Sequence, residues 1–144
     1  MVQHHVAGVA GVEDALEGSQ LVLVVEDDPD VRDVVKLSLE AAGYQVVTAG
    51  DGKAGITHAR QLRPDAILLD IMLPEVDGWE VIRALKLAPE TSQIPVVMMT
   101  AYGNQQDRVR GTLAGAHYVT KPFKLGAMPS MIANAIKTQP DAPR

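Results

Sequence analysis

Polar residues that could perform chemistry follow four of the short apolar runs in this sequence. Acidic residues follow two of the runs, a threonine follows a third and a lysine a fourth: Glu26, Asp27, Asp28, Asp70, Thr100 and Lys121. If these runs are parallel strands of one sheet, their carboxyl ends meet at the edge where such sheets bind ligands. The sequence therefore predicts one polar crevice that contains all of these groups.

The residue types in this predicted crevice suit metal-assisted phosphoryl transfer. Carboxylates gathered in one crevice repel one another, and a divalent cation such as Mg²⁺, which prefers oxygen ligands, would relieve the repulsion. With the cation bound, one carboxylate can attack a phosphoryl donor and form an aspartyl phosphate. The cation and Lys121 would neutralise charge on the transferring group, and the Thr100 hydroxyl could donate a hydrogen bond to it.

Each of these residues also has an ordinary structural interpretation. Asp28 precedes Pro29, a typical start of a helix, so Asp28 could be an N-cap instead of a ligand, and Asp51 has the same cap interpretation. A Thr that ends a strand, or a Lys-Pro pair such as Lys121-Pro122, is commonly a turn residue. Only the coincidence of complementary groups at four predicted strand ends favours a functional site.

Alternating apolar patterns supply the strands and helices that must position these groups. The predicted strands are Leu21–Val25, Gln45–Ala49, Ala66–Leu69, Pro95–Met99 and His117–Thr120. The predicted helices lie between Asp28 and Gly43, from Asp51 to about Arg63, around Trp79–Leu85, at Gln105–Ala114, and at Met128–Ile136 with Pro129 in its first turn. The helix after Asp51 has only a weak apolar stripe. Strands that alternate with helices predict a parallel sheet covered on both faces, with right-handed crossovers.

Composition excludes several classes of protein. The chain has 144 residues, of which 47% are hydrophobic, enough for one domain with a core and too many for a disordered chain. It contains no cysteine, which excludes disulfides and thiolate metal sites. A net charge of −5 without a basic patch argues against direct nucleic-acid binding by this chain. The apolar runs are far shorter than the roughly 18 residues of a membrane helix, and the chain start does not resemble a signal peptide, so we expect a cytoplasmic location away from membranes.

The ends of the chain differ in composition from its middle. Residues 1–19 are rich in Gly, Ala, Val and His without a clear period, and we expect a flexible leader. Residues 20–138 are expected to form the domain. Residues 139–144 contain two prolines and are expected to be a frayed tail or the start of a linker.

The ordered set of motifs closely resembles the receiver domain of two-component response regulators. The motifs are Val24–Pro29, Asp70–Pro74 with Gly78, Met99–Ala101 and Tyr118–Phe123. The resemblance covers about residues 20–138. It implies a flavodoxin-like (βα)5 fold, a doubly wound α/β protein with a five-stranded parallel sheet in the strand order 2-1-3-4-5.

The resemblance implies specific roles for the acidic residues. Asp70 would accept a phosphoryl group from a sensor histidine kinase or a histidine phosphotransfer protein. Asp27, Asp70 and the backbone carbonyl of Met72 would bind Mg²⁺ or Mn²⁺ directly, and Glu26 would act through water. The chain would be a signalling module that catalyses only its own phosphorylation and dephosphorylation, and not an enzyme with a free substrate.

The resemblance also implies a switch around the phosphoryl group. Lys121 would pair with the phosphoryl group, Thr100 would move toward it beside the small Ala101, and Tyr118 would swing inward behind Thr100. Such a step is a two-state change biased by a local charge event. It would repack the face formed by the fourth helix, the fifth strand and the fifth helix, which a downstream target or a missing output domain would read.

Four functions are compatible with these motifs. The chain could be a stand-alone receiver in a phosphorelay, or a receiver cut from a larger regulator or hybrid kinase. A Mg²⁺-dependent phosphohydrolase on the same scaffold is disfavoured, because haloacid-dehalogenase-type phosphatases place a second Asp where this chain has Met72. A degenerate docking module is disfavoured by the intact acidic set. The acidic residues and the fifth-helix Arg typical of DNA-binding members that dimerise through the switching face do not appear, which leaves the output surface open.

Overall fold

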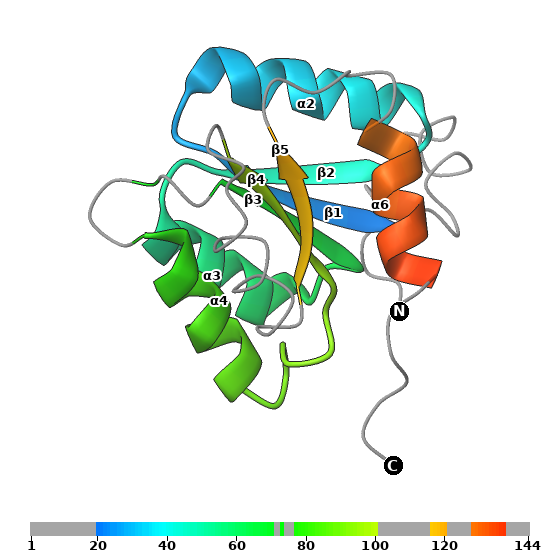
Figure 1. Cartoon of the computed structure of the whole chain (residues 1–144). Helices are drawn as coiled ribbons and strands as arrows, with labels where there is room; N and C mark the ends of the chain where they lie inside the picture. The colour runs from blue at the N-terminus through cyan, green and yellow to red at the C-terminus, as the bar shows by residue number, and fades with distance from the viewer. Residues whose placement is uncertain (1–19, 71–72, 74–76, 101–115, 121–127, 138–144) are drawn as a thin grey trace, which may run out of the picture.

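The computed structural model describes residues 20–70, 73, 77–100, 116–120 and 128–137 (Figure 1). The described elements are β1 (Leu21–Val25), α2 (Pro29–Ala41), β2 (Gln45–Ala49), α3 (Gly52–Leu62), β3 (Ala66–Asp70), α4 (Gly78–Leu87), β4 (Val96–Thr100), β5 (Ala116–Thr120) and α6 (Met128–Lys137). The predicted leader, tail and Gln105–Ala114 helix lie outside these residues. Among the described residues, no helix is both long and apolar enough to cross a bilayer.

The strands form one sheet in the order β2-β1-β3-β4-β5, and every pair of neighbours is parallel. The predicted parallel α/β sheet is therefore confirmed. The register places Val25 opposite both Ala49 and Leu69. Farther along the sheet, Asp70 is the partner of Met99. The carboxyl ends of the central strands consequently reach the same edge, which the site requires.

Helices cover both faces of this sheet (Figure 1). On one face, side chains of α3 and α4 pack with Leu23 and Val25 of β1. On the other face, side chains of α2 and α6 pack with Val22 and Val24 of the same strand. Successive β1 residues therefore enter different apolar clusters, which explains why this strand is a continuous apolar run.

Aspartates begin three of the helices. The Asp28 carboxylate accepts hydrogen bonds from the backbone N–H groups of Asp30 (2.9 Å) and Val31 (3.3 Å), so the cap interpretation of Asp28 is the correct one. Asp51 caps α3 in the same way through the N–H of Ala54 at 2.8 Å. Asp77 caps α4, which the sequence reasoning did not anticipate.

Helix α3 packs unusually close to the sheet, and its small residues explain its weak apolar stripe. Its buried residues are Gly52, Gly55 and Ala59. A Cβ atom added at Gly55 would lie 2.9 Å from a Cγ atom of Val25 in β1. A larger apolar residue at this position would force the helix away from the strand. This helix therefore buries backbone and small side chains where other helices bury large apolar side chains.

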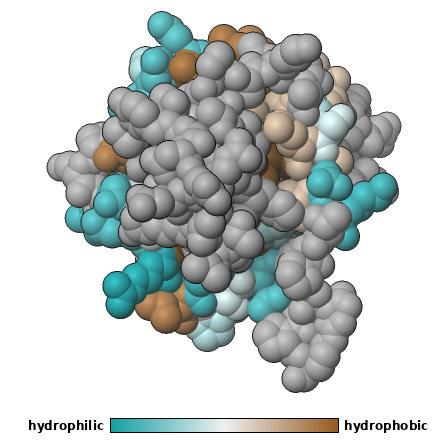
Figure 2. All heavy atoms as spheres, viewed as in Figure 1, coloured by the Kyte–Doolittle hydropathy of each residue, from teal (hydrophilic) through white to brown (hydrophobic). Residues whose placement is uncertain are grey.

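The described surface exposes few large apolar side chains. Those with the highest exposure are Val34, Leu37, Leu62 and Leu87. In the view of Figure 2, the coloured part of the surface shows small apolar patches beside hydrophilic residues. Apolar residues scattered in this way are ordinary on a soluble domain and need no partner to explain them.

Candidate metal centre

Three of the predicted carboxylates converge at the carboxyl edge of the sheet. Glu26 and Asp27 follow β1, and Asp70 is the last residue of the neighbouring strand β3. One ligand oxygen from each of the three lies within 4.8 Å of the others. The alignment of Val25 with Leu69 brings the ends of the two strands level, and so brings the carboxylates together.

The three carboxylates differ in their access to solvent. Glu26 is fully buried and Asp70 is 4% exposed, whereas Asp27 is exposed. Placing two carboxylates in a buried position beside a third is unfavourable unless they are compensated by hydrogen bonds or cations. A divalent cation bound at the cluster would supply such compensation.

The backbone around Glu26 is held by several hydrogen bonds. The Glu26 N–H donates to the carbonyl of Ala49 at 3.0 Å. The Glu26 carbonyl accepts from Nη1 of Arg32 at 3.0 Å, and its Oε2 accepts from the N–H of Asp28 at 3.2 Å. The first acidic residue of the site is thus fixed by strand β2, by helix α2 and by the following loop.

The donor set fits a hard divalent cation. All three groups are carboxylates, and oxygen ligands of this kind suit Mg²⁺ or Mn²⁺ better than softer metals. Two oxygens bound directly to one Mg²⁺ are at most about 4 Å apart, so a cluster within 4.8 Å needs little adjustment to hold one ion. Asp27 and Asp70 would hold it directly, and the buried Glu26 would hold it through water.

The remaining predicted site residues are only partly described. Thr100 is the last residue of β4, level with Thr120 of β5, at the same edge as the carboxylates. Tyr118 lies in β5 opposite Met98, and the description of both Thr100 and Tyr118 stops at the backbone. The remaining three predicted site residues lie outside the described residues: Met72, Ala101 and Lys121.

Sequence reasoning missed one cation beside the site. Arg32 stands in the first turn of α2 and reaches back to the Glu26 carbonyl. A positive charge is unfavourable near a helix N-terminus, where the backbone dipole is itself positive. This unfavourable position was a signal that the side chain serves something other than its helix.

Comparisons with known proteins agree with this geometry. The family model described as "Response regulator receiver domain" matches residues 22–133. The DNA-binding dual master transcriptional regulator RpaA of Synechocystis is 47% identical over 108 residues, which are 74% of this chain and 45% of that protein. The DNA-binding response regulator MtrA of Mycolicibacterium smegmatis is 38% identical over 125 residues, 86% of this chain and 54% of that protein. The chain thus spans about half the length of these curated relatives.

Solved structures agree as well. The chemotaxis protein CheY4 of Vibrio cholerae superimposes with a TM-score of 0.77 at 28% identity, covering 81% of this chain and 98% of that one. The receiver domain of the sensor histidine kinase PA1611 of Pseudomonas aeruginosa, solved with a magnesium ion in its active-site cleft, gives a TM-score of 0.76 at 32% identity, covering 83% and 99%. These similarities support a flavodoxin-like α/β fold.

Proposed function

Because this chain belongs to the response regulator receiver domain family, we propose that Asp70 accepts a phosphoryl group from a histidine kinase or a histidine phosphotransfer protein. The observation that carries the proposal is the position of Asp70. It is a nearly buried carboxylate at the end of a central strand, within 4.8 Å of two further carboxylates. A divalent cation would relieve their repulsion, which leaves one Asp70 oxygen able to attack phosphorus.

The transfer itself is a simple exchange of bonds. An Asp70 carboxylate oxygen forms a bond to phosphorus while the bond from phosphorus to the donor nitrogen of a phosphohistidine breaks, and the released imidazole takes up a proton. Bound Mg²⁺ or Mn²⁺ would neutralise charge on the phosphoryl oxygens. Asp27, Asp70 and the Met72 carbonyl would hold that ion directly, and Glu26 would act through water.

The switch involves the second half of the sheet. Lys121 pairs with the phosphoryl group, Thr100 moves toward it past Ala101, and Tyr118 follows. The position of Thr100 at the carboxyl edge, in the strand next to Asp70, supports this assignment. The face that changes includes β5 and α6.

A protein surface, rather than nucleic acid, reads this face. The net charge of −5 is unfavourable for contact with a phosphate backbone. Two relatives are DNA-binding regulators of about twice the matched length, so the reader is either an attached output domain or a separate target. The chain works in the cytoplasm as a signalling module that turns over no free substrate.

Phosphorylation by a small donor tests the proposal. The protein is incubated with acetyl phosphate and Mg²⁺, and the intact mass is recorded for the wild type, for Asp70→Asn and for Asp33→Asn, an exposed aspartate on α2. We expect one phosphoryl group on the wild type and on the Asp33 variant and none on the Asp70 variant. No gain by the wild type, together with no response of Trp79 fluorescence to beryllofluoride, would leave a docking module as the better explanation.

The phosphohydrolase alternative has its own test. A phosphohydrolase would release product continuously from a chromogenic phosphate ester, whereas a receiver would not. Sustained turnover that is lost in Asp70→Asn would contradict the switch and favour the hydrolase.

A further inference from the structure

We propose that Arg32 is a positioning residue for the metal-binding carboxylates, and that Gly50 supports this role by leaving room for the Arg32 guanidinium. This inference rests on the proposed function, because it concerns the same site. Neither residue is among the site residues that the receiver-domain resemblance implied. Both are identified by contacts at the end of β1.

The first step is the peptide bond that Arg32 holds. Its Nη1 donates a hydrogen bond of 3.0 Å to the carbonyl of Glu26, and this carbonyl belongs to the peptide that joins Glu26 to Asp27. On the other side of Glu26, the N–H is bonded to Ala49. Because the peptide is planar, holding its carbonyl also fixes the direction of the N–Cα bond of Asp27, and the Asp27 side chain branches from that Cα atom. Arg32 therefore orients the exposed carboxylate through the backbone of the buried one.

The second step is the choice of acceptor. Arginine only donates hydrogen bonds, so a guanidinium bonded to the carboxylates would use the same oxygen lone pairs that the metal needs. Arg32 instead bonds a carbonyl and brings a fixed positive charge next to the acidic cluster. A half-buried charge is screened less by solvent than an exposed one. The arginine thus favours a compact carboxylate cluster without competing for the ligand atoms.

The third step concerns Gly50, the residue after β2. A Cβ atom built at Gly50 would lie 3.0 Å from Nη1 of Arg32, closer than real Cβ contacts normally are. The backbone does not explain this glycine, since the positive-φ glycine among the described residues is Gly43, with φ 99°. The lack of room beside Arg32 explains the glycine better, because a methyl group at residue 50 would displace the end of the Arg32 side chain.

Magnesium affinity measures the proposed role directly. The dissociation constant of Mg²⁺ is determined by isothermal titration calorimetry on the full chain, without any phosphoryl donor. We expect Arg32→Met to weaken binding about tenfold, the size typical for residues that orient metal ligands. Arg32→Lys should weaken it less, because the charge remains but the geometry of the donor changes. Gly50→Ala should weaken it severalfold while leaving the arginine in the chain.

A matched control and a double variant sharpen the result. Lys36 lies one turn farther along α2, and Lys36→Met removes the same charge, so its affinity should stay within twofold of the wild type. If Gly50 acts only through Arg32, the double variant Arg32→Met with Gly50→Ala should bind no more weakly than Arg32→Met alone. Fully additive losses would overturn the role of Gly50.

A merely structural role gives a different pattern. Urea unfolding without Mg²⁺ would then show a less stable Arg32→Met protein whose folded form binds Mg²⁺ with the wild-type constant, and this outcome would overturn the proposal. If Arg32→Met fails to fold, Arg32→Lys and Gly50→Ala decide in the same way. A wild type that binds no Mg²⁺ contradicts the proposed function itself, whereas binding by the wild type and equally by the Arg32 variants contradicts the positioning role alone.

Discussion

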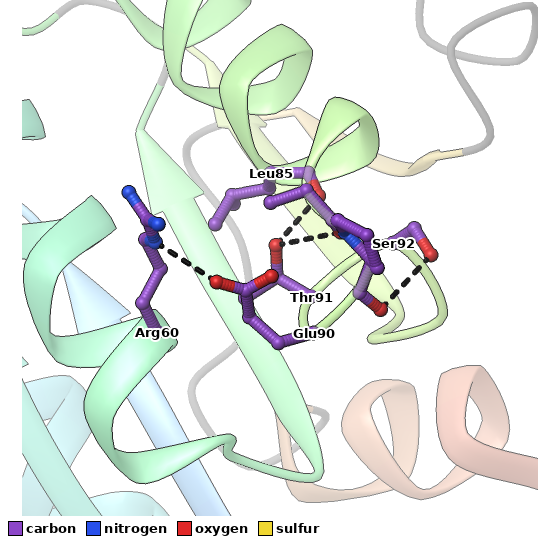
Figure 3. Close-up of polar contacts among 7 residues, drawn as sticks. Arg60, Leu85, Glu90, Thr91 and Ser92 are labelled. Carbon is purple, nitrogen blue, oxygen red and sulfur yellow. Dashed lines mark hydrogen bonds and ion pairs between the residues drawn. The ribbon is translucent and has the colours of Figure 1, made fainter.

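In the loop between α4 and β4, at the amino edge of the sheet, a threonine hydroxyl and a lysine ammonium bond backbone carbonyls, while at the carboxyl edge like charges are gathered together. The first pattern is seen in the loop between α4 and β4, where the Thr91 hydroxyl donates to the carbonyl of Leu85 at 2.6 Å (Figure 3). Nearby, Arg60 of α3 pairs with Glu90 at 3.2 Å. The second pattern is the cluster of Glu26, Asp27 and Asp70.

The Thr91 hydroxyl replaces a backbone hydrogen bond that the chain cannot form. The carbonyl of Leu85 would ordinarily accept from the N–H four residues later, but residue 89 is proline and has none. The Thr91 hydroxyl supplies the missing donor. The Lys86 ammonium donates to the carbonyls of Ser92 and Ile94, each at 3.3 Å, and burial lowers the pKa of this lysine. These contacts at the amino edge stabilise the folded chain.

The difference between the two edges predicts that substitutions at one edge affect stability and that substitutions at the other affect Mg²⁺ binding. A change to Thr91 or Glu90 at the amino edge should lower the free energy of unfolding and leave Mg²⁺ affinity unchanged, because these residues lie at the opposite edge from the acidic cluster. A change to the carboxylates at the carboxyl edge should alter Mg²⁺ binding, because these are the groups that could hold the cation. The following predictions test this separation, from the largest expected effect to the smallest.

The largest effect should come from Mg²⁺ itself. At a concentration one hundredfold above its dissociation constant, Mg²⁺ should raise the free energy of unfolding by about 2.7 kcal/mol, because it binds only the folded chain. Urea unfolding with and without Mg²⁺ measures this increment. Asp70→Asn should lose most of it, whereas Thr91→Val should keep all of it. An equal increment in both variants would show that the ion binds elsewhere.

Removal of the Thr91 hydroxyl should have the next largest effect. Thr91→Val keeps the shape of the side chain but leaves the buried Leu85 carbonyl without this donor, which should lower the free energy of unfolding by about 2 kcal/mol. Ser92→Ala is the matched control, since its hydroxyl makes only an exposed contact of 3.5 Å with the Pro89 carbonyl. A similar loss in both variants would argue against the capping role.

The ion pair between Arg60 and Glu90 should have the smallest effect. A hydrogen bond from its own backbone N–H, and then the Arg60 guanidinium, hold the pKa of Glu90 below its usual value of 4.5. The charged form is therefore favoured by folding, and its contribution is present above pH 4.5 and lost as the pH falls through the lower, folded-state pKa. Thermal unfolding of wild type and Glu90→Gln should differ slightly at pH 7 and converge in acid. A difference that grows in acid would contradict this sign.

The sequence predicts the parts of this molecule that follow from local pattern. The strand β1 could be predicted because a strand buried on both faces is a continuous apolar run. The cap at Asp28 could be predicted because an Asp followed by a Pro is typical of a helix start. The convergence of Asp27 and Asp70 followed from the rule that parallel strands end at one edge. These inferences needed no long-range distances.

Features that depend on space between elements could not be predicted in this way. The close packing of Gly55 against Val25 and the contact of Arg32 with Gly50 both depend on how far apart two elements lie. The pattern of α3 looked weak because the sequence does not show that small residues there are buried. The roles of Thr100, Tyr118 and Lys121 stay predictions, since the structure describes at most the backbone of these residues.

The close approach of Gly55 to Val25 has a mechanical consequence. Val25 is fully buried between this helix and its neighbouring strands, and it immediately precedes the acidic pair. This close packing leaves little room for the end of β1 to shift toward α3, so we expect this part of the sheet to stay in place. If Asp70 is phosphorylated as proposed, we therefore expect the resulting movement in the other half of the sheet, at β4 and β5.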